Sequence, residues 1–383
     1  MTSRRLFPAL LHNELEKIWA HRGRVLIIAF ILLVFGGSFI AYRNYEGAQK
    51  AYRSEISSAE SQVSQIKRQL AHAQGSQKKA LQAQLQVPET ILQQAHQNSL
   101  GTIQVRPQMA SLKQSIKTAP TPFKGSSEEQ LAMEQYRLQH GITQYQSTSH
   151  DGYRLVGQVF SGLTMILIAL VALAISADRV SSEFEAGTWG GLLLHAPKRR
   201  SVYLAKLSAS LIVIWSFMVA AAVGFFVIAG LLMGFGSPDN PHVVSLKVST
   251  APQPSPGQIV IPVQHFHMLP QWSYDLLSLG LAMLAIGALV SIFLALSMLT
   301  RSTVFSLIVG AVLILSDVLA HAVGSLALID PAIHLPLMSE WTRSLAMQYN
   351  MASLSLRTGL AVLLGWTTVS ILFSLWFSKR LDL

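Results

Sequence analysis

The sequence contains no cysteine and few charged residues. Without cysteine the chain has no disulfide, no thiolate metal site and no cysteine nucleophile. Only 13% of its 383 residues are charged, whereas 51% are hydrophobic, and the apolar residues stand in long blocks. This composition excludes an ordinary soluble domain and is typical of a chain that is embedded in a membrane.

The sequence also lacks the common catalytic and nucleotide-binding motifs. It has no His-Glu-x-x-His pair for zinc, no Gly-x-Ser-x-Gly nucleophile elbow and no phosphate loop. His265 and His267 are the nearest approach to a metal pair, but no carboxylate stands near them, which favours an ordinary exposed pair. We therefore expect that this chain is not an enzyme and that it binds no metal or cofactor. If ATP is used, another polypeptide must bind it.

Basic residues outnumber acidic ones, and the formal net charge is +10. A basic balance can indicate nucleic acid. In a chain with several membrane spans, however, basic residues usually set the topology and contact anionic lipid head groups. The second interpretation is favoured here, so we expect membrane lipids and no nucleic acid among the partners.

Six apolar stretches approach or exceed the ~20 residues that are needed to cross the hydrocarbon core of a bilayer. The first has a core too long for a cleaved signal peptide, and no small-residue cleavage site follows it cleanly. We therefore predict an all-α membrane protein with six transmembrane helices. The predicted spans are approximately Val25–Tyr42, Leu155–Ala177, Leu207–Phe235, Leu276–Leu299, Thr303–Leu328 and Thr358–Phe377.

The basic residues predict the orientation of these spans. They gather in residues 1–24, in the connector 178–206, at Arg301 and in the tail with Lys379 and Arg380. All four segments lie on one side of the membrane, which the positive-inside rule identifies as cytoplasmic. Both termini are then cytoplasmic, because six spans return the chain to its starting side. No further role is assigned to Lys206, which counts only toward the basic balance of the connector.

Residues 1–24 are predicted to form a cytoplasmic amphipathic helix ahead of span one (25–43). One face carries apolar side chains, and charged side chains lie elsewhere. Such a helix lies along the inner leaflet, as an anchor and as a contact surface for a cytoplasmic partner. Its apolar face consists of Leu11, Leu15, Ile18 and Trp19.

Three segments fall outside the cytoplasm. Residues 44–152 are long enough for a helical domain, and the apolar positions from Tyr52 to Ala73 alternate spacings of four and three, which predicts a coiled-coil-like seam. Residues 237–270 are rich in proline and predict an irregular cap with short strands such as Gln258–Val263. Residues 329–357 predict short re-entrant or interfacial helices.

A few polar residues stand within the predicted spans. Asp317 and His321 lie one helical turn apart in span five, so they share a face. Ionisable groups at membrane depth commonly line a functional path, although an internally paired Asp and His that only order the packing fit equally well. Asp275, near the outer end of span four, is expected to be solvated, and Gln158 to bond between helices.

The connector after span two has more structure than a topological loop requires. Glu183 and Glu185 suit the first turn of a helix, Gly187 allows another backbone to approach, and Pro197 ends the segment. Between them stand Leu192, Leu193 and Leu194 as an apolar contact. This order of residues predicts a cytoplasmic docking surface rather than a simple loop.

The same residues resemble a known family. The order Glu183-x-Glu185-x-Gly187-Thr188, three leucines, Pro197 and Arg200 is similar to the connector of type-2 ABC exporter permeases. In that family this pattern forms the coupling-helix region, which docks into a separate ATPase subunit. Six spans, an amphipathic amino-terminal helix and re-entrant helices before the last span agree with it. The resemblance covers residues 1–43 and 153–383, and the insertion 44–152 departs from simpler members.

The resemblance implies the permease subunit of an ATP-binding-cassette exporter in a bacterial inner membrane. Such a subunit works as a homodimer or a related heterodimer with two ATPase subunits, which bind the ATP and Mg²⁺. The residues that match the coupling pattern are Glu183, Glu185, Gly187, Thr188, Leu192, Pro197, Arg199 and Arg200.

The substrate stays open among antibiotics, peptides, lipids and ions. A second interpretation also stays open, in which the chain is a non-transporting sensor or scaffold. Its outer coiled coil would then bind an envelope partner and relay a signal across the membrane.

Overall fold

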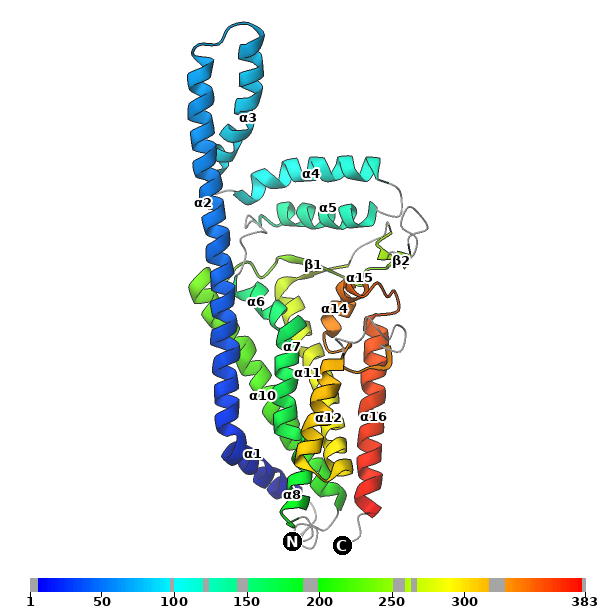
Figure 1. Cartoon of the computed structure of the whole chain (residues 1–383). Helices are drawn as coiled ribbons and strands as arrows, with labels where there is room; N and C mark the ends of the chain where they lie inside the picture. Colours follow the sequence, from blue (N-terminus) through cyan, green and yellow to red (C-terminus); the bar gives the residue numbers. More distant parts are fainter. Residues whose placement is uncertain are drawn as a thin grey trace.

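The structure is a computed structural model, and it describes residues 6–96, 100–119, 124–142, 151–188, 199–250, 259–262, 267–316 and 328–380. Helices dominate these residues. The first runs without interruption through α1 (Leu6–Ile31), a π-helical turn η1 (Leu32–Gly36) and α2 (Gly37–Leu70). In Figure 1 this helix begins obliquely at the lower end of the molecule and then rises along its whole height.

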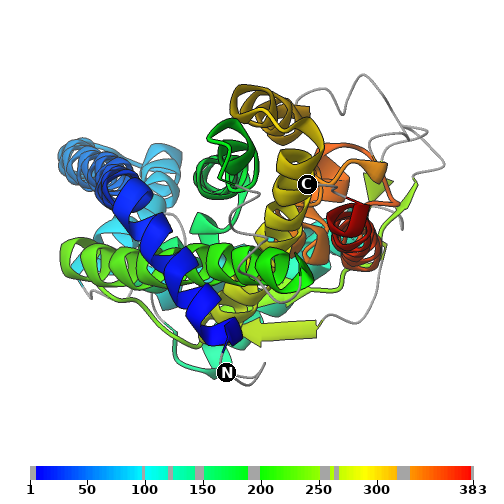
Figure 2. The same ribbon diagram turned by 90° about the horizontal axis from the view of Figure 1, so that it is seen from below.

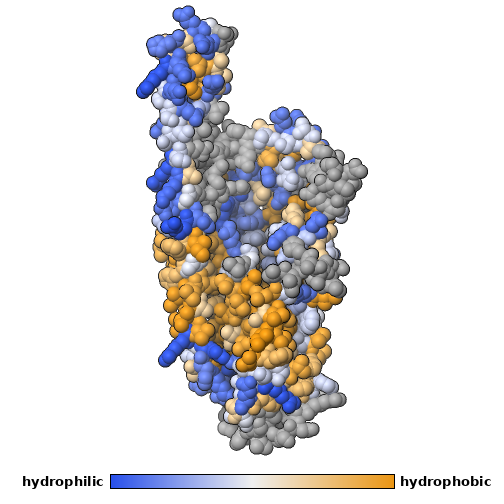
Figure 3. Space-filling view, viewed as in Figure 1, coloured by the Kyte–Doolittle hydropathy of each residue, from blue (hydrophilic) through white to orange (hydrophobic). Residues whose placement is uncertain are grey.

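Five helices in the described part of the chain are long and apolar enough to cross a membrane. They form a bundle whose surface is a broad apolar belt, with polar surface above and below it (Figure 3). Large apolar side chains such as Leu32, Phe39, Val223 and Leu372 are exposed on this belt, as expected for contact with lipid tails. The five stretches are Phe7–Leu70, Thr164–Glu185, Arg200–Met233, Gln271–Thr300 and Leu356–Ser378.

The predicted fifth span is described only in its first half. It contains the apolar helix α12 (Thr303–Leu315), which is shorter than a membrane crossing. Residues 317–327 lie outside the described residues, and with them Asp317 and His321. The structure therefore supports a multi-span helical protein, while the sixth span stays a prediction.

The predicted second span is broken near its upper end. It consists of α6 (Gly152–Val159) and α7 (Gly162–Ser176). Ser161 between them is extended, and Gly162 has a φ of +54°, a left-handed conformation that glycine adopts without strain. Asp151 caps α6 by accepting a hydrogen bond from the Arg154 N–H at 2.9 Å. The dipeptide Ser161-Gly162 is a turn signal, but the apolar run that follows it led to the prediction of one continuous span.

The remaining long helices complete the bundle. A short helix, α8 (Ser181–Glu185), follows α7, and α10 (Arg199–Met233), α11 (Gln271–Thr300) and α16 (Leu356–Arg380) return through the belt. The largest buried apolar cluster joins all of them, and Phe160, Ile214 and Phe293 are among its fully buried members. Seen from below, α1 crosses diagonally over the lower part of α10 (Figure 2).

Above the belt, helices and short strands form a polar cap. Helix α2 continues upward and packs against α3 (Ser76–His96), burying Ala59 and Val63. Helices α4 (Leu100–Thr118) and α5 (Lys124–Gln139) run across the direction of the bundle (Figure 1). These helices occupy most of the segment that was predicted to be a helical domain.

Two small antiparallel sheets lie under α5. One pairs β1 (Pro241–Val244) with β4 (His267–Pro270), and the other pairs β2 (Ser249–Thr250) with β3 (Ile259–Val260). Strand β3 falls inside the predicted strand piece 258–263. Gly125 of α5 lies against the carbonyl of Ile261, where a Cβ atom would come within 2.1 Å. The first turn of α5 therefore rests directly on the backbone of this cap.

The segment before α16 holds two short helices, α14 (Leu337–Trp341) and α15 (Ser344–Gln348). A buried pair, His334 and Glu340, is hydrogen-bonded beneath them. Burial alone lowers the pKa of His334, but the hydrogen bond and the charge of Glu340 raise this pKa by more. Burial raises the pKa of Glu340. The hydrogen bond of this pair links α14 to the preceding turn.

One sequence expectation is wrong at the top of α11. Asp275 was expected to be solvated, but it is only 7% exposed. Its Oδ1 accepts a hydrogen bond from Gln271 Nε2 at 2.8 Å, one turn earlier in α11. Helix α6 covers it from the other side, because Gly157 has no side chain there to separate the two helices. Gln158, expected to bond between helices, is exposed instead.

Candidate functional site

The connector between α7 and α10 begins with the short helix α8, whose end is fixed by backbone hydrogen bonds. Helix α8 ends at Glu185. Gly187, two residues later, has a left-handed φ of +67°, and the N–H of Thr188 donates to the carbonyl of Glu183 at 3.0 Å. A side chain at Gly187 would meet no atom within 4 Å, so only the backbone conformation requires glycine there. Glu183 stands in the first turn of α8, whereas Glu185, expected there as well, is the last residue of the helix. No described backbone approaches Gly187, which was expected to allow such a contact.

Glu14 of α1 lies at the centre of an ion-pair cluster at the lower end of the bundle. Its side chain is 3% exposed, although α1 was expected to lie on the membrane surface. Arg179 Nη2 donates to Glu14 Oε2 at 2.5 Å, and Lys17 Nζ donates to Glu14 Oε1 at 3.2 Å. A buried carboxylate needs such partners, because removing a charge from water is costly.

Lys206 of α10 completes this cluster. Its side chain is 1% exposed, and its Nζ donates to both oxygens of Glu14 at 3.2 Å. It also donates to Glu183 Oε1 at 2.7 Å, and Lys17 Nζ donates to the same oxygen at 3.1 Å. We call these five residues the lower ion-pair cluster: Glu14, Lys17, Arg179, Glu183 and Lys206.

The cluster joins three segments that are distant in the sequence. Glu14 and Lys17 come from α1, Arg179 and Glu183 from the connector, and Lys206 from α10. It is not saturated, since Glu183 Oε2 and Arg179 Nε are buried without a hydrogen-bond partner within the described residues. Buried ion pairs add little net stability but fix geometry, since breaking one leaves a charge unpaired. The cluster therefore holds the connector in one position against α1 and α10.

Further contacts tie the connector to α11 and α12. Ser297 Oγ of α11 accepts hydrogen bonds from the N–H groups of Val180 and Ser181 at 3.1 and 2.9 Å. Glu185 Oε1 accepts from the Thr303 N–H and Glu185 Oε2 from the Thr303 hydroxyl, both at 2.8 Å. Thr303 begins α12, so Glu185 supplies an acceptor to the first turn of that helix.

Two cationic side chains extend the same network. Arg22 of α1 forms an ion pair with Asp178 at the start of the connector. Arg301, in the turn between α11 and α12, lies over the rings of Phe184 and Phe377 at 5.2 and 5.8 Å. Since Phe377 belongs to α16, the connector reaches the last helix as well. The segment 178–188 is thus in contact, directly or through Arg301, with every other long helix of the bundle.

The structure separates the predicted coupling residues into two groups. Glu183 is largely buried in the lower ion-pair cluster, with 14% of its side chain exposed. Glu185, Gly187, Thr188 and Arg200 are exposed. Arg199 begins α10, and Leu192 and Pro197 lie outside the described residues.

Sequence reasoning missed Lys206 and the pairing of Arg179 with Glu14. A signal was present for Lys206, because it stands eight residues into an otherwise apolar helix, where an ionisable group needs a partner. Lys206 was counted only as one of the basic residues that set the topology, so its need for a buried acidic partner was not recognised. Arg179 carried no comparable signal, since a basic residue at the end of a span is ordinary.

Comparison with known proteins assigns the chain to a family. A family model described as ABC-2 family transporter protein matches residues 9–383, which is nearly the whole sequence. No curated protein and no solved structure matches the sequence significantly. The match agrees with the five apolar helices and with the resemblance of the connector. The chain belongs to the ABC-2 family of multi-pass transporter membrane proteins, which work with an ABC ATPase.

Proposed function

We propose that the chain is the permease subunit of an ATP-driven exporter in a bacterial inner membrane. It has six spans with both termini in the cytoplasm, and it assembles as a dimer of permeases with two ATPase subunits that bind ATP and Mg²⁺. In this arrangement the lower end of the bundle faces the cytoplasm. The apolar run 303–328 is long enough to supply the remaining span.

The observation that supports this proposal is the position of the connector. Its exposed residues, Glu185, Gly187, Thr188 and Arg200, are accessible to a partner from below. Its buried residues contact α1, α10 and α11 through ion pairs and hydrogen bonds. A displacement of the exposed side of the connector would therefore move α1, α10 and α11 together.

The mechanism follows from these contacts. ATP binding closes the two ATPase subunits and moves the connector, as in other transitions where packed elements move as rigid bodies. Glu183 carries that displacement to Lys206 and so to α10, while Ser297 carries it to α11. The unpaired oxygen of Glu183 and the unpaired Nε of Arg179 give the cluster hydrogen-bonding capacity for a second arrangement. A path for substrate then opens between the two permeases.

Two variants separate docking from transmission. Arg200→Glu reverses a charge on the exposed side, so it should lower the amount of ATPase that copurifies with the permease. Glu183→Gln removes a charge from the buried cluster and should leave copurification intact while reducing stimulation of the ATPase and export. Arg68→Glu, an equally exposed arginine on α2, is the matched control for charge reversal.

The outcomes are distinct. If Arg200→Glu copurifies as much ATPase as Arg68→Glu does, this side of the connector is not the docking surface. If Glu183→Gln retains full ATPase stimulation and export, the buried cluster does not transmit the movement. Loss of copurification in Glu183→Gln would mean that its role is in assembly and not in coupling.

A second function is favoured by one observation, the projection of α2 and α3 (Figure 1) far above the apolar belt (Figure 3). A helical pair in this position can bind an envelope partner, so that the chain acts as a sensor or scaffold and not as a transporter. Copurification with a protein that carries a phosphate loop would exclude an autonomous scaffold. Export that persists after removal of α3 would exclude an obligatory role for the projection.

A further inference from the structure

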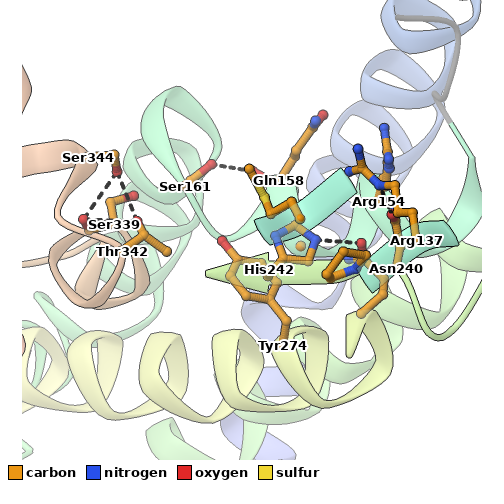
Figure 4. Close-up of a pocket in the computed structure, with 14 residues that line it drawn as sticks. Arg137, Arg154, Gln158, Ser161, Asn240, His242, Tyr274, Ser339, Thr342 and Ser344 are labelled. Carbon is orange, nitrogen blue, oxygen red and sulfur yellow. Dashed lines mark hydrogen bonds between the residues drawn. The ribbon is translucent and has the colours of Figure 1, made fainter. Parts of the chain in front are cut away.

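A polar cavity of about 400 Å³ lies at the top of the bundle, beneath α5 and β1. It is distant from the lower ion-pair cluster, and no role assigned so far uses it. Figure 4 shows its lining, which comes from α5, α6, β1, α11 and the segment 339–344. No carboxylate is among the described residues that line it. The main polar groups are Arg137, Arg154, Gln158, Ser161, Asn240, His242, Gln271, Tyr274, Ser339, Thr342 and Ser344.

Arg137 supplies positive charge to this cavity. Its Nη1 donates to Glu134 at 2.7 Å and its Nε donates to Asn240 Oδ1 at 3.1 Å, which fixes the plane of the guanidinium. Arg154 lies beside it with its Nε 4.0 Å from Asp151. A rigidly held guanidinium with a second one nearby suits a phosphate or carboxylate group.

His242 supplies a hydrogen-bond acceptor. Gln271 Nε2 donates to Asp275, so the oxygen of Gln271 faces His242 and accepts from its Nε2 at 2.6 Å. Burial lowers the pKa of His242, so the ring is neutral at pH 7 and its Nδ1 carries a lone pair. The ring is held in place by stacking on Tyr274, with centroids 4.1 Å apart. A hydroxyl group of a ligand can donate to Nδ1.

A second cavity, of about 420 Å³, lies next to the first and is mostly apolar. It lies between the first helix and the helices α6, α7 and α10. Gln158 of α6 lines both cavities, so the two adjoin at this residue. The lining of the second cavity is Leu32, Leu33, Gly36, Gly37, Ile40, Ala41, Asn44, Leu155, Gln158, Val159, Thr164, Leu167 and Phe225.

The apolar cavity borders the π-helical turn η1, a helix irregularity that is common at functional sites. Gly36 at the end of this turn faces open space, since a Cβ atom there would meet nothing within 4 Å. Gly37 beside it packs against Phe225, where a Cβ atom would come within 2.7 Å of the ring. Gly36 thus leaves room for a ligand, whereas Gly37 allows the first helix to pack closely against Phe225 of α10.

We infer that the two cavities together bind an anionic membrane lipid with a hydroxylated head group. Its phosphate lies at Arg137 and Arg154, its hydroxyl donates to His242 Nδ1, and one acyl chain passes Gln158 into the apolar cavity. Each cavity has a volume in the range of small-ligand sites. The polar cavity lies above the apolar belt and the second cavity within it, which matches the two ends of a lipid.

This inference does not depend on export or on the ATPase, because it concerns binding alone. The chain contains no cysteine, so Gln158→Cys creates the only thiol in the purified full-length protein. The measurement is the rate at which a polar maleimide labels this thiol. The added probes are dihexanoyl phosphatidylglycerol, dihexanoyl phosphatidylcholine and glycerol phosphate. Ser57→Cys, an exposed position on α2, is the control thiol.

We expect phosphatidylglycerol to slow labelling at position 158 and to leave labelling at position 57 unchanged. It should act at a concentration at least about 100-fold below that of glycerol phosphate, because each buried methylene of the chain adds favourable free energy. Equal protection by phosphatidylcholine would overturn the selection for an anion. Equal protection by glycerol phosphate would assign a soluble ligand, and no protection by any probe would reject the site.

A second measurement does not depend on the new thiol. Gly36→Leu fills the apolar cavity without meeting another atom at its Cβ position, whereas Gly365→Leu makes the same change on an exposed face of α16. Native mass spectrometry then counts bound phosphatidylglycerol on the otherwise unchanged protein. The Gly36 variant should lose bound lipid, and the Gly365 variant should retain it. Equal lipid binding by both variants would overturn the inference.

Discussion

Replacing Lys206 with methionine removes one ammonium group from the lower ion-pair cluster and keeps a side chain of similar length. In the folded protein this ammonium contacts both buried carboxylates of the cluster. After the change Glu14 still has Lys17 and Arg179, whereas Glu183 has only Lys17. The carboxylate of Glu183 is then balanced by Lys17 alone. The ion pair that joined Glu183 of the connector to α10 is lost.

The expected cost follows from burial. Removing one partner of a buried ion pair typically costs about 3–5 kcal/mol, because the other charge stays buried and unpaired. Lys17 remains beside both carboxylates, but its side chain is 35% exposed and so compensates weakly. We therefore expect Lys206→Met to lower the free energy of unfolding by about 3 kcal/mol, the lower end of that range.

The assay is equilibrium unfolding of the purified protein in mixed micelles, followed by circular dichroism. Lys67→Met is the matched control, since Lys67 makes a comparable 2.9 Å pair with Glu89 on the surface. That change should cost no more than about 1 kcal/mol. In the double variant Lys206→Met with Glu183→Gln, the unpaired carboxylate is gone, so about 1–2 kcal/mol should return. If Lys206→Met costs no more than Lys67→Met, the cluster does not hold the connector.

Two further predictions concern the cap. Because Glu340 raises the pKa of His334, the stabilisation from this pair is present below the ordinary pKa of histidine and falls as pH rises through the raised pKa of His334. Hydrogen exchange of residues 328–356, corrected for intrinsic rates, should lose protection toward pH 9, and an identical profile in His334→Gln would contradict this. Gly125→Ala should cost about 1–3 kcal/mol, because its Cβ meets the Ile261 carbonyl. Gly47→Ala, in open space, should not destabilise, and equal proteolysis of α5 in both variants would refute the contact.

The helical character and most of the apolar spans could be predicted because lipid leaves the backbone few alternatives. The continuity of the first helix could not be predicted as readily. Its amphipathic start, its span and its outer extension differ in composition, yet Leu6–Leu70 contains no break other than the π-helical turn. The break at Ser161 and Gly162 was missed although a turn dipeptide marks it, because the apolar residues of α7 extend the hydrophobic stretch far beyond it. A change in composition therefore marked a change of backbone path in the second span but not in the first helix.

The burial of Asp275 shows what a single sequence cannot supply. Its hydrogen bond to Gln271 is local and lies one turn away, so that contact was accessible to sequence reasoning. Its cover is not local, because it comes from α6 at Gly157, more than a hundred residues earlier in the chain. A polar residue near the end of a span therefore looks solvated until the packing of another helix is known.

The two glutamates of α8 lead to a sharper conclusion about coupling. Residues two positions apart on a helix point about 200° away from each other, so Glu183 and Glu185 cannot both face one partner. The structure agrees, since Glu183 turns inward to Lys206 and Glu185 turns to Thr303. If an ATPase docks from below as proposed, it meets the side of Glu185, Gly187 and Arg200. A variant at Glu183 then tests how the bundle receives the movement, and a variant at Arg200 tests where the movement is applied.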